Sequence, residues 1–347
     1  MRKLLLIMML ISSLTVPARA DEITAPSAPN YAQELMPPDT ESFGEGLLYV
    51  VKSALQTFQP EIIAGCGICL SIIAVMMLTS VMDGFSGKVK GITELVGTLT
   101  VVCLLLGNTT TLISDAADTV RGLSEYGKLL LPVMTTAMAA QGSITGSAAI
   151  YTGTAVFNAV LCGLISGLLI PMLYIFLSLA IGSSAIGEDL LKRLRDFAKW
   201  LVSWCLKTVM YIFTGYITIT GVVSGTTDQA ALKAAKLTIS GAVPVVGGIL
   251  SDASEAVLVS AGVVKNAVGM YGLIAVAAIA MGPFLRIGAQ YLLLKLTAAV
   301  CGVFGSKRTT ELVGDFSSAM GILLAMTGCV CLLLLISMVC FMKGVAG

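Results

Sequence analysis

Residues Gly241–Gly272 read GAVPVVGGILSDASEAVLVSAGVVKNAVGMYG, and here the hydrophobic spans of the chain are interrupted by residues that break, cap and restart a helix. Pro244 lacks a backbone donor and the pair Gly247-Gly248 frees the backbone, so an arriving helix is predicted to stop. Non-helical backbone at membrane depth is tolerated only where protein buries it or water bathes it. The stretch is therefore expected outside the bilayer, or lining a cavity inside the protein.

A new helix is predicted to start within the same stretch. Asp252 and Glu255 have the spacing of a capping box, and the helix that they begin runs to about Val268. Two interpretations stay open: an amphipathic helix lying on the membrane, or an element that lines a pore or docks a partner. On the second interpretation the candidate gating or docking residues are Pro244, Gly247, Gly248, Asp252, Glu255, Lys265 and Asn266.

The composition is that of an integral membrane protein. Of 347 residues, 56% are hydrophobic and only 12% are charged, and the mean hydropathy is +0.94. Several apolar runs approach the length that spans a bilayer, and helices satisfy their own backbone hydrogen bonds in lipid. We therefore predict an all-α, polytopic membrane helix bundle of about 6–8 transmembrane helices, some of them broken by Pro or Gly.

The first twenty residues have the three parts of a secretory signal peptide. A basic start is followed by an apolar core at residues 4–14 and by Ala18-Arg19-Ala20, an A-x-A cleavage site. Cleavage would place Asp21 on the outer side, whereas an uncleaved anchor is the alternative. Losing three basic residues turns the formal net charge of +1 slightly negative, which argues against nucleic acid as a partner.

The mature chain divides into two parts. Residues 21–58 are expected to form an exterior flexible segment, with an amphipathic surface helix over Phe43–Phe58, and residues 59–347 a multi-span membrane domain. We expect Ser114–Lys128 to be an exterior loop and Leu129–Ile150 a re-entrant or interior-lining element. The expected spans are Glu61–Met82, Ile92–Ile113, Thr154–Ile181 with a break at Pro171, Leu201–Val223, the halves Val268–Gly282 and Phe284–Phe304 on either side of Pro283, and Met320–Met342.

Basic residues between these spans predict which loops are cytoplasmic. Lys88 and Lys90, the group from Lys192 to Lys199, and Lys307-Arg308 all mark cytoplasmic loops under the positive-inside rule. Trp200 and Trp204 follow the second group, where interfacial aromatic residues belong. A weak internal repeat, 154–223 against 262–342, would be parallel because both of its basic loops are cytoplasmic.

Few residues suggest chemistry. Arg286 and Lys295 fall inside an expected span, where charge is costly, and are candidates for an interior polar role. The sequence has no histidine, and its nine cysteines lie in apolar runs, including Cys66 and Cys69 of a C-x-x-C motif that we interpret as small-residue packing. We find no nucleophile elbow, phosphate loop or zinc signature, and therefore expect no enzyme activity, no cofactor and no metal.

Two stretches, PVVGGILSDASEAVL…VKNAVG within Pro244–Gly269 and GPFLRIGAQYLLLKLTAAV at Gly282–Val300, resemble the stage III sporulation protein AE family of endospore-forming bacteria. The resemblance implies a non-enzymatic subunit of the channel or secretion-like complex that connects mother cell and forespore after engulfment. It further implies residence in the mother-cell membrane around the forespore. The implied partners are the lipid bilayer, the other stage III A-operon proteins and the forespore protein Q, and the chain is compatible with a homo-oligomer.

A second hypothesis follows from the helix breaks alone. Broken membrane helices bind substrate in secondary transporters, so a permease with its site near Pro171 and Pro283 is the alternative. Ion-coupled carriers commonly use intramembrane acids, and Glu94 is almost the only acid inside an expected span. This scarcity favours the channel-complex hypothesis.

Overall fold

The computed structural model describes residues 25–38, 42–85, 90–140, 144–187, 189–219, 267–304 and 306–344. Within these ranges the chain is helical, as the all-α prediction required, and contains no strand. The elements are α2 (Asn30–Gln33), α3 (Phe43–Phe85), α4 (Lys90–Ala140), α5 (Ile144–Leu164), the π-helical segment η1 (Ile165–Leu169), α6 (Ile170–Ile186), α7 (Asp189–Ile219), α10 (Ala267–Phe304) and α11 (Lys307–Gly344).

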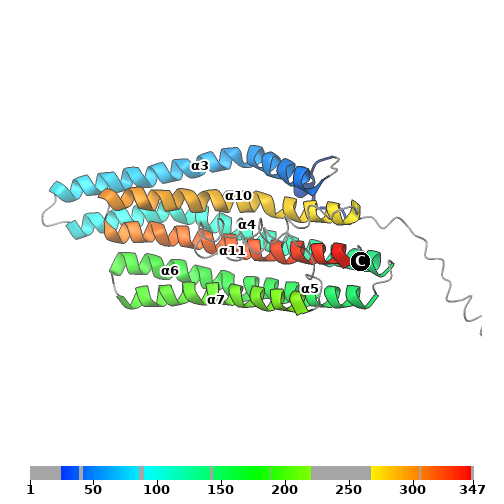
Figure 1. Ribbon diagram of the computed structural model, residues 1–347. Helices are drawn as coiled ribbons and strands as arrows, with labels where there is room; N and C mark the ends of the chain where they lie inside the picture. Colours follow the sequence, from blue (N-terminus) through cyan, green and yellow to red (C-terminus); the bar gives the residue numbers. More distant parts are fainter. Residues whose placement is uncertain are drawn as a thin grey trace, which may run out of the picture.

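The long helices are arranged as three antiparallel hairpins. Short connections join α3 to α4, α6 to α7, and α10 to α11, and the two members of each pair pack against each other. Figure 1 shows all three connections at the same end of the bundle, on the left of the view. We call this end the hairpin end. Lys90, the group from Lys192 to Lys199, and Lys307-Arg308, which were expected at or beside cytoplasmic loops, therefore gather at this end of the molecule.

Helix α11 forms the centre of the bundle. It packs against α10 and α4 on one side and against α5, α6 and α7 on the other (Figure 1). Its most apolar window is 89% buried, whereas that of the outermost helix α3 is only 22% buried. A helix that is apolar all round, as Met320–Met342 is, belongs in such a central position.

An expected boundary between two helices and an expected loop are both helical instead. Helix α3 runs unbroken through Pro60, whose ring lies on the exposed face, so the amphipathic helix and the first span are one element. Helix α4 likewise continues through Ser114–Lys128, which is not an exterior loop. Its charged residues recur every three or four positions on one face, and Ala116, Val120 and Leu123 on the other face are buried.

The expected breaks at two prolines have different outcomes. Before Pro171 the helix widens into η1, and the chain continues as α6 in the same direction. At Gly282-Pro283 there is no interruption, because α10 is one helix from Ala267 to Phe304. The two expected halves are therefore a single helix. The prediction of one re-entrant or interior-lining element over Leu129–Ile150 is also wrong, because the described part of this range is divided between the end of α4 and the start of α5.

The N-terminal segment packs on the bundle rather than remaining loose. The Tyr126 hydroxyl of α4 donates a hydrogen bond to the Pro26 carbonyl (3.3 Å), and the Ala28 amide donates to the Tyr271 hydroxyl of α10 (3.4 Å). Ala32 and Leu35 are buried. The part of residues 21–58 that the structure describes thus lies at the end opposite the hairpin end (Figure 1).

Five helical stretches within the described residues are long and apolar enough to cross a membrane. They are Phe43–Met82, Gly91–Thr136, Ile150–Ile186, Val268–Val303 and Lys307–Met342. Helix α7 is not among them. The expected signal peptide lies outside the described residues, and the count of about 6–8 spans stays a prediction.

Candidate functional site: an ion-pair cluster between three helices

Arg286 of α10 is the centre of a partly buried charged cluster between α3, α4 and α10. Its Nε contacts the Glu61 carboxylate of α3, and its Nη1 lies 2.8 Å from Asp115 Oδ2 of α4. The guanidinium also lies 5.8 Å from the centre of the Phe58 ring, at a distance where a cation–π attraction operates. One cation and two carboxylates leave the cluster with a formal charge of −1.

The two carboxylates are held differently. Asp115 Oδ2 is fully buried, and the approach of Arg286 is not aligned as a hydrogen bond, so this contact is an ion pair by distance alone. The Glu61 side chain is 48% exposed and can reach solvent, whereas that of Asp115 is 28% exposed. Asp115 is therefore the partner that depends more on Arg286 for its charge.

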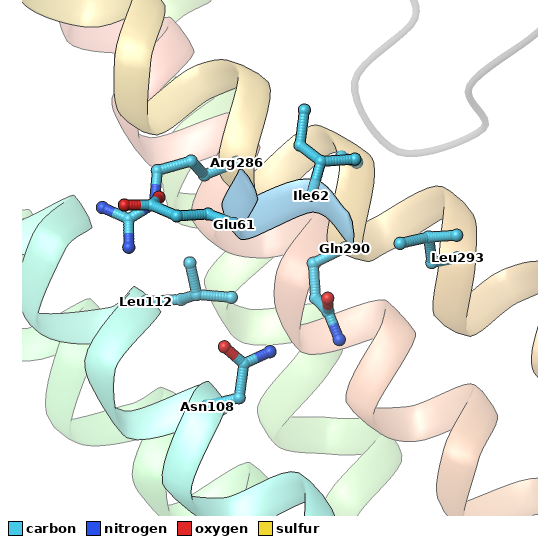
Figure 2. Close-up of a pocket in the computed structure, with 8 residues that line it drawn as sticks. Glu61, Ile62, Asn108, Leu112, Arg286, Gln290 and Leu293 are labelled. Atoms are coloured by element: carbon cyan, nitrogen blue, oxygen red, sulfur yellow. The ribbon is translucent and has the colours of Figure 1, made fainter. Parts of the chain in front are cut away.

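A small cavity of about 30 Å³ adjoins the cluster, which is enough space to admit a water molecule. Figure 2 shows the amides of Gln290 and Asn108 facing each other across it, with Glu61 and Arg286 on one side. The side chain of Gln290 is buried, although it carries an amide with four hydrogen-bonding positions. The cavity is thus lined by polar side chains from α3, α4 and α10.

Two glycines let α3 and α10 approach closely around this cavity. A Cβ at Gly282 would lie 2.6 Å from the Phe58 ring, and a Cβ at Gly65 would lie 2.8 Å from Gln290 Oε1. Small residues at a helix contact permit such approach in membrane proteins. The glycines therefore position Phe58 against Arg286 and Gln290 against the cavity.

The cluster is suited to holding three helices in register rather than to catalysis. Its groups are carboxylates, a guanidinium and amides, and the described residues contain no cluster of ligands that could hold a metal ion. A buried charge loses its hydration and is stable only when it is paired. Each of α3, α4 and α10 contributes one charge, so displacing any of the three helices would leave a charge unpaired.

The structure separates the residues that the sequence analysis had grouped. Arg286 lies inside the bundle, whereas Lys295, two to three turns closer to the hairpin end of α10, is exposed between the exposed side chains of Leu292 and Leu296. This placement differs from the interior one expected for Lys295. The seven candidate gating or docking residues, Pro244, Gly247, Gly248, Asp252, Glu255, Lys265 and Asn266, lie outside the described residues, and their role stays a prediction.

Sequence reasoning missed the partners of Arg286. Asp115 had been assigned to an exterior loop and Glu61 to the boundary of a span. The helical spacing of the charges in Ser114–Lys128 was the signal that would have placed Asp115 on an interior helix.

A second charged cluster joins α7 to α11 near the hairpin end. Arg195 Nη1 lies 2.7 Å from Asp315 Oδ2, and both side chains are more than 85% buried. The Lys199 ammonium donates a hydrogen bond to Ser318 Oγ (3.0 Å), and Lys192 lies 3.4 Å from Glu311. The basic group expected in a short cytoplasmic loop is therefore mostly the inward face of the first turns of α7.

Comparison with known proteins gives two findings. Residues 40–344 match the family model described as stage III sporulation protein AE. A curated relative, "Stage III sporulation protein AE" of Bacillus subtilis (strain 168), is 24% identical over 208 residues. That alignment covers 60% of this chain and 52% of the relative, so the chain spans about half the length of the curated relative that it matches. No solved structure matches the chain.

Proposed function

Because the chain belongs to the stage III sporulation protein AE family, we propose that it is a non-enzymatic membrane subunit of the channel or secretion-like complex that connects mother cell and forespore. In this role it would be needed for forespore development after engulfment. The single observation that carries the proposal is the family match over residues 40–344.

The proposed location is the mother-cell membrane that surrounds the forespore. The basic hairpin end would face the mother-cell cytoplasm, and the end that carries residues 25–38 would face the space between the two membranes. A cleaved signal peptide would place the mature N-terminus on that same outer side. Both sequence signals therefore support one orientation of the bundle.

The dimensions of the bundle support a role between two membranes. At 1.5 Å per residue, the 43 residues of α3 and the 51 residues of α4 extend roughly 65 Å and 75 Å. The hydrocarbon core of a bilayer is only about 30 Å thick. Much of the bundle thus lies beyond the hydrocarbon, where other stage III A-operon proteins and the forespore protein Q are the proposed partners.

The transporter alternative finds less support. Pro171 and Pro283 lie on helices α6 and α10, which pack on different sides of α11 (Figure 1). The helix at Pro283 is also continuous, so it offers no unwound backbone to a substrate. A site between these two prolines is therefore not assembled in this chain.

Deleting the gene in its spore-forming host tests the proposal. We expect forespores that complete engulfment and then arrest, with a late forespore-specific reporter silent, and we expect the intact gene to restore the reporter. Normal spores in the deletion strain would contradict the proposed function. The purified protein in liposomes, given an ion gradient, should move no small solute.

A further inference from the structure

The amide of Gln290 is a buried polar group without a partner. The residue is 5% exposed, yet within the described part of the chain neither this amide nor that of Asn108 takes part in a hydrogen bond. Both amides face the small cavity beside the ion-pair cluster (Figure 2). Buried polar groups nearly always have a partner, because an unmatched one keeps the full cost of its lost hydration. The cavity is therefore expected to hold a ligand that forms hydrogen bonds with these amides.

The charge of the cluster indicates the sign of this ligand. Arg286 pairs with both Glu61 and Asp115, so the three side chains together carry a formal charge of −1. A carboxylate can accept about four hydrogen bonds, so the contact with Arg286 leaves Glu61 able to accept more from the cavity that it lines. An anion would meet two carboxylates here, and a water molecule would leave the negative charge uncompensated. The site thus favours a cation that donates hydrogen bonds.

The size of the cavity limits the choice among such cations. Its volume is about 30 Å³, enough for a group of the size of a water molecule. A planar guanidinium is larger than this space, and a quaternary ammonium is larger and has no N–H donor. A primary ammonium is compact and carries three N–H donors. Because the oxygen and nitrogen of an amide are interchangeable in shape, Asn108 and Gln290 can both present an oxygen, and with Glu61 they supply three acceptors.

The cavity is accessible from the exposed side of α3. The Glu61 side chain is 48% exposed, and Ile62 lines both this cavity and a larger hollow of about 610 Å³. The larger hollow follows the face of α3 from Leu48 to Ile63, where Leu55 is also exposed. An amine that enters beside Glu61 can therefore place an aliphatic stem against apolar side chains while its ammonium lies in the cavity. A lysine side chain combines such a stem with such a head group.

We propose that this cavity binds a primary alkylammonium group, of the kind that a lysine side chain of a partner protein presents. Its N–H groups donate to the Glu61 carboxylate and to the amide oxygens of Asn108 and Gln290, and its charge brings the cluster to neutrality. Arg286 keeps its contacts with both carboxylates. Because α3, α4 and α10 each contribute one acceptor, the ligand also holds the three helices together. This inference does not depend on the proposed function.

Thermal unfolding of the full chain in detergent tests the inference, with n-butylammonium chloride as a probe that mimics a lysine side chain. We expect the unfolding temperature to rise and to saturate with concentration, because a ligand that binds only the folded state stabilises it. Tetramethylammonium chloride and sodium chloride at the same ionic strength should give no saturable rise, since neither cation donates a hydrogen bond. Glu61→Gln and Gln290→Leu, each compared with its own ligand-free baseline, should weaken the apparent affinity by at least about tenfold.

Glu125→Gln is the matched control, because it also removes one negative charge but lies on the exposed face of α4 and does not line the cavity. This variant should keep the affinity of the unmodified chain. If Gln290→Leu does not fold, Glu61→Gln still decides the result, because the Glu61 side chain is half exposed.

Three outcomes would overturn the inference. Equal shifts with butylammonium, tetramethylammonium and sodium would reduce the effect to ionic strength. An unchanged affinity of Glu61→Gln would show that the amine binds elsewhere on the protein. An equal rise with ammonium chloride, which has no aliphatic stem, would assign the cavity to the free ion rather than to a lysine side chain.

Discussion

Arg286 is a single cation that two carboxylates from different helices require. Replacing it by Met should destabilise the bundle by about 1–3 kcal/mol, because the buried oxygen of Asp115 loses the counter-charge of the Arg286 guanidinium. Thermal unfolding in detergent would measure this loss. Lys295→Met on the same helix is the matched control and should change little, since Lys295 is exposed.

A second substitution separates charge pairing from lost packing at the same place. If pairing is the cause, adding Asp115→Asn to Arg286→Met should recover part of the lost stability, because the unpaired buried carboxylate is then gone. Two additive losses would show instead that the Arg286 side chain acts through its contacts with Phe58 alone.

Helices α7 and α11 are joined by a buried ion pair, Arg195–Asp315, and by a more exposed one, Lys192–Glu311, so the two can be compared. Breaking it with Arg195→Met should cost about 3–5 kcal/mol, the usual penalty for leaving a buried charge unpaired. Lys192→Met breaks a pair with Glu311 that is about one third exposed, and should cost less than about 1 kcal/mol. If both variants lost the same free energy of unfolding in urea, burial would not determine the strength of these ion pairs.

At the scale of elements, the contact between α3 and α10 depends on the absence of a side chain at Gly282. Gly282→Ala should push the Phe58 ring away, lower the thermal stability and weaken the attachment of α3. Gly67→Ala on α3 is the control, because nothing lies within 4 Å of the position that its Cβ would take. A stabilising effect of Gly282→Ala, or equal losses from both, would contradict this account.

The same elements show how far the sequence alone could go. Hydropathy predicted the all-helical membrane architecture and the long apolar helices, since lipid leaves few alternatives for the backbone. It failed at Pro60 and Pro283, where packing of α3 against α10 maintains a helix that local propensity would interrupt. It also failed at Asp115, because a helix with one charged face was interpreted as a loop, although Asp115 pairs with Arg286, which is distant in sequence.

At the scale of the whole molecule, the three hairpins run in the same direction, so the first and the last long helix of the bundle have their free ends at the same end of it. Helix α3 starts, and α11 ends, at the end opposite the three connections (Figure 1). In the described parts of 154–223 and 262–342, the hairpin of α6 and α7 runs in the same direction as the hairpin of α10 and α11, while the internal repeat itself stays a prediction. An even number of crossings follows if α7 crosses the membrane with the other five.

This arrangement predicts the sidedness of the chain. Alkaline phosphatase fused after Gly347 should be active, because the C-terminus would face the exterior, where the enzyme folds with its disulfides. Green fluorescent protein inserted beside Ser306, between α10 and α11, should fluoresce, because the basic hairpin end would face the cytoplasm. If the phosphatase were inactive and the inserted fluorescent protein dark, the whole bundle would have the opposite orientation in the membrane. If both reporters were on the same side of the membrane, α10 and α11 would not form a hairpin across it. Only that outcome would require a different path for the chain.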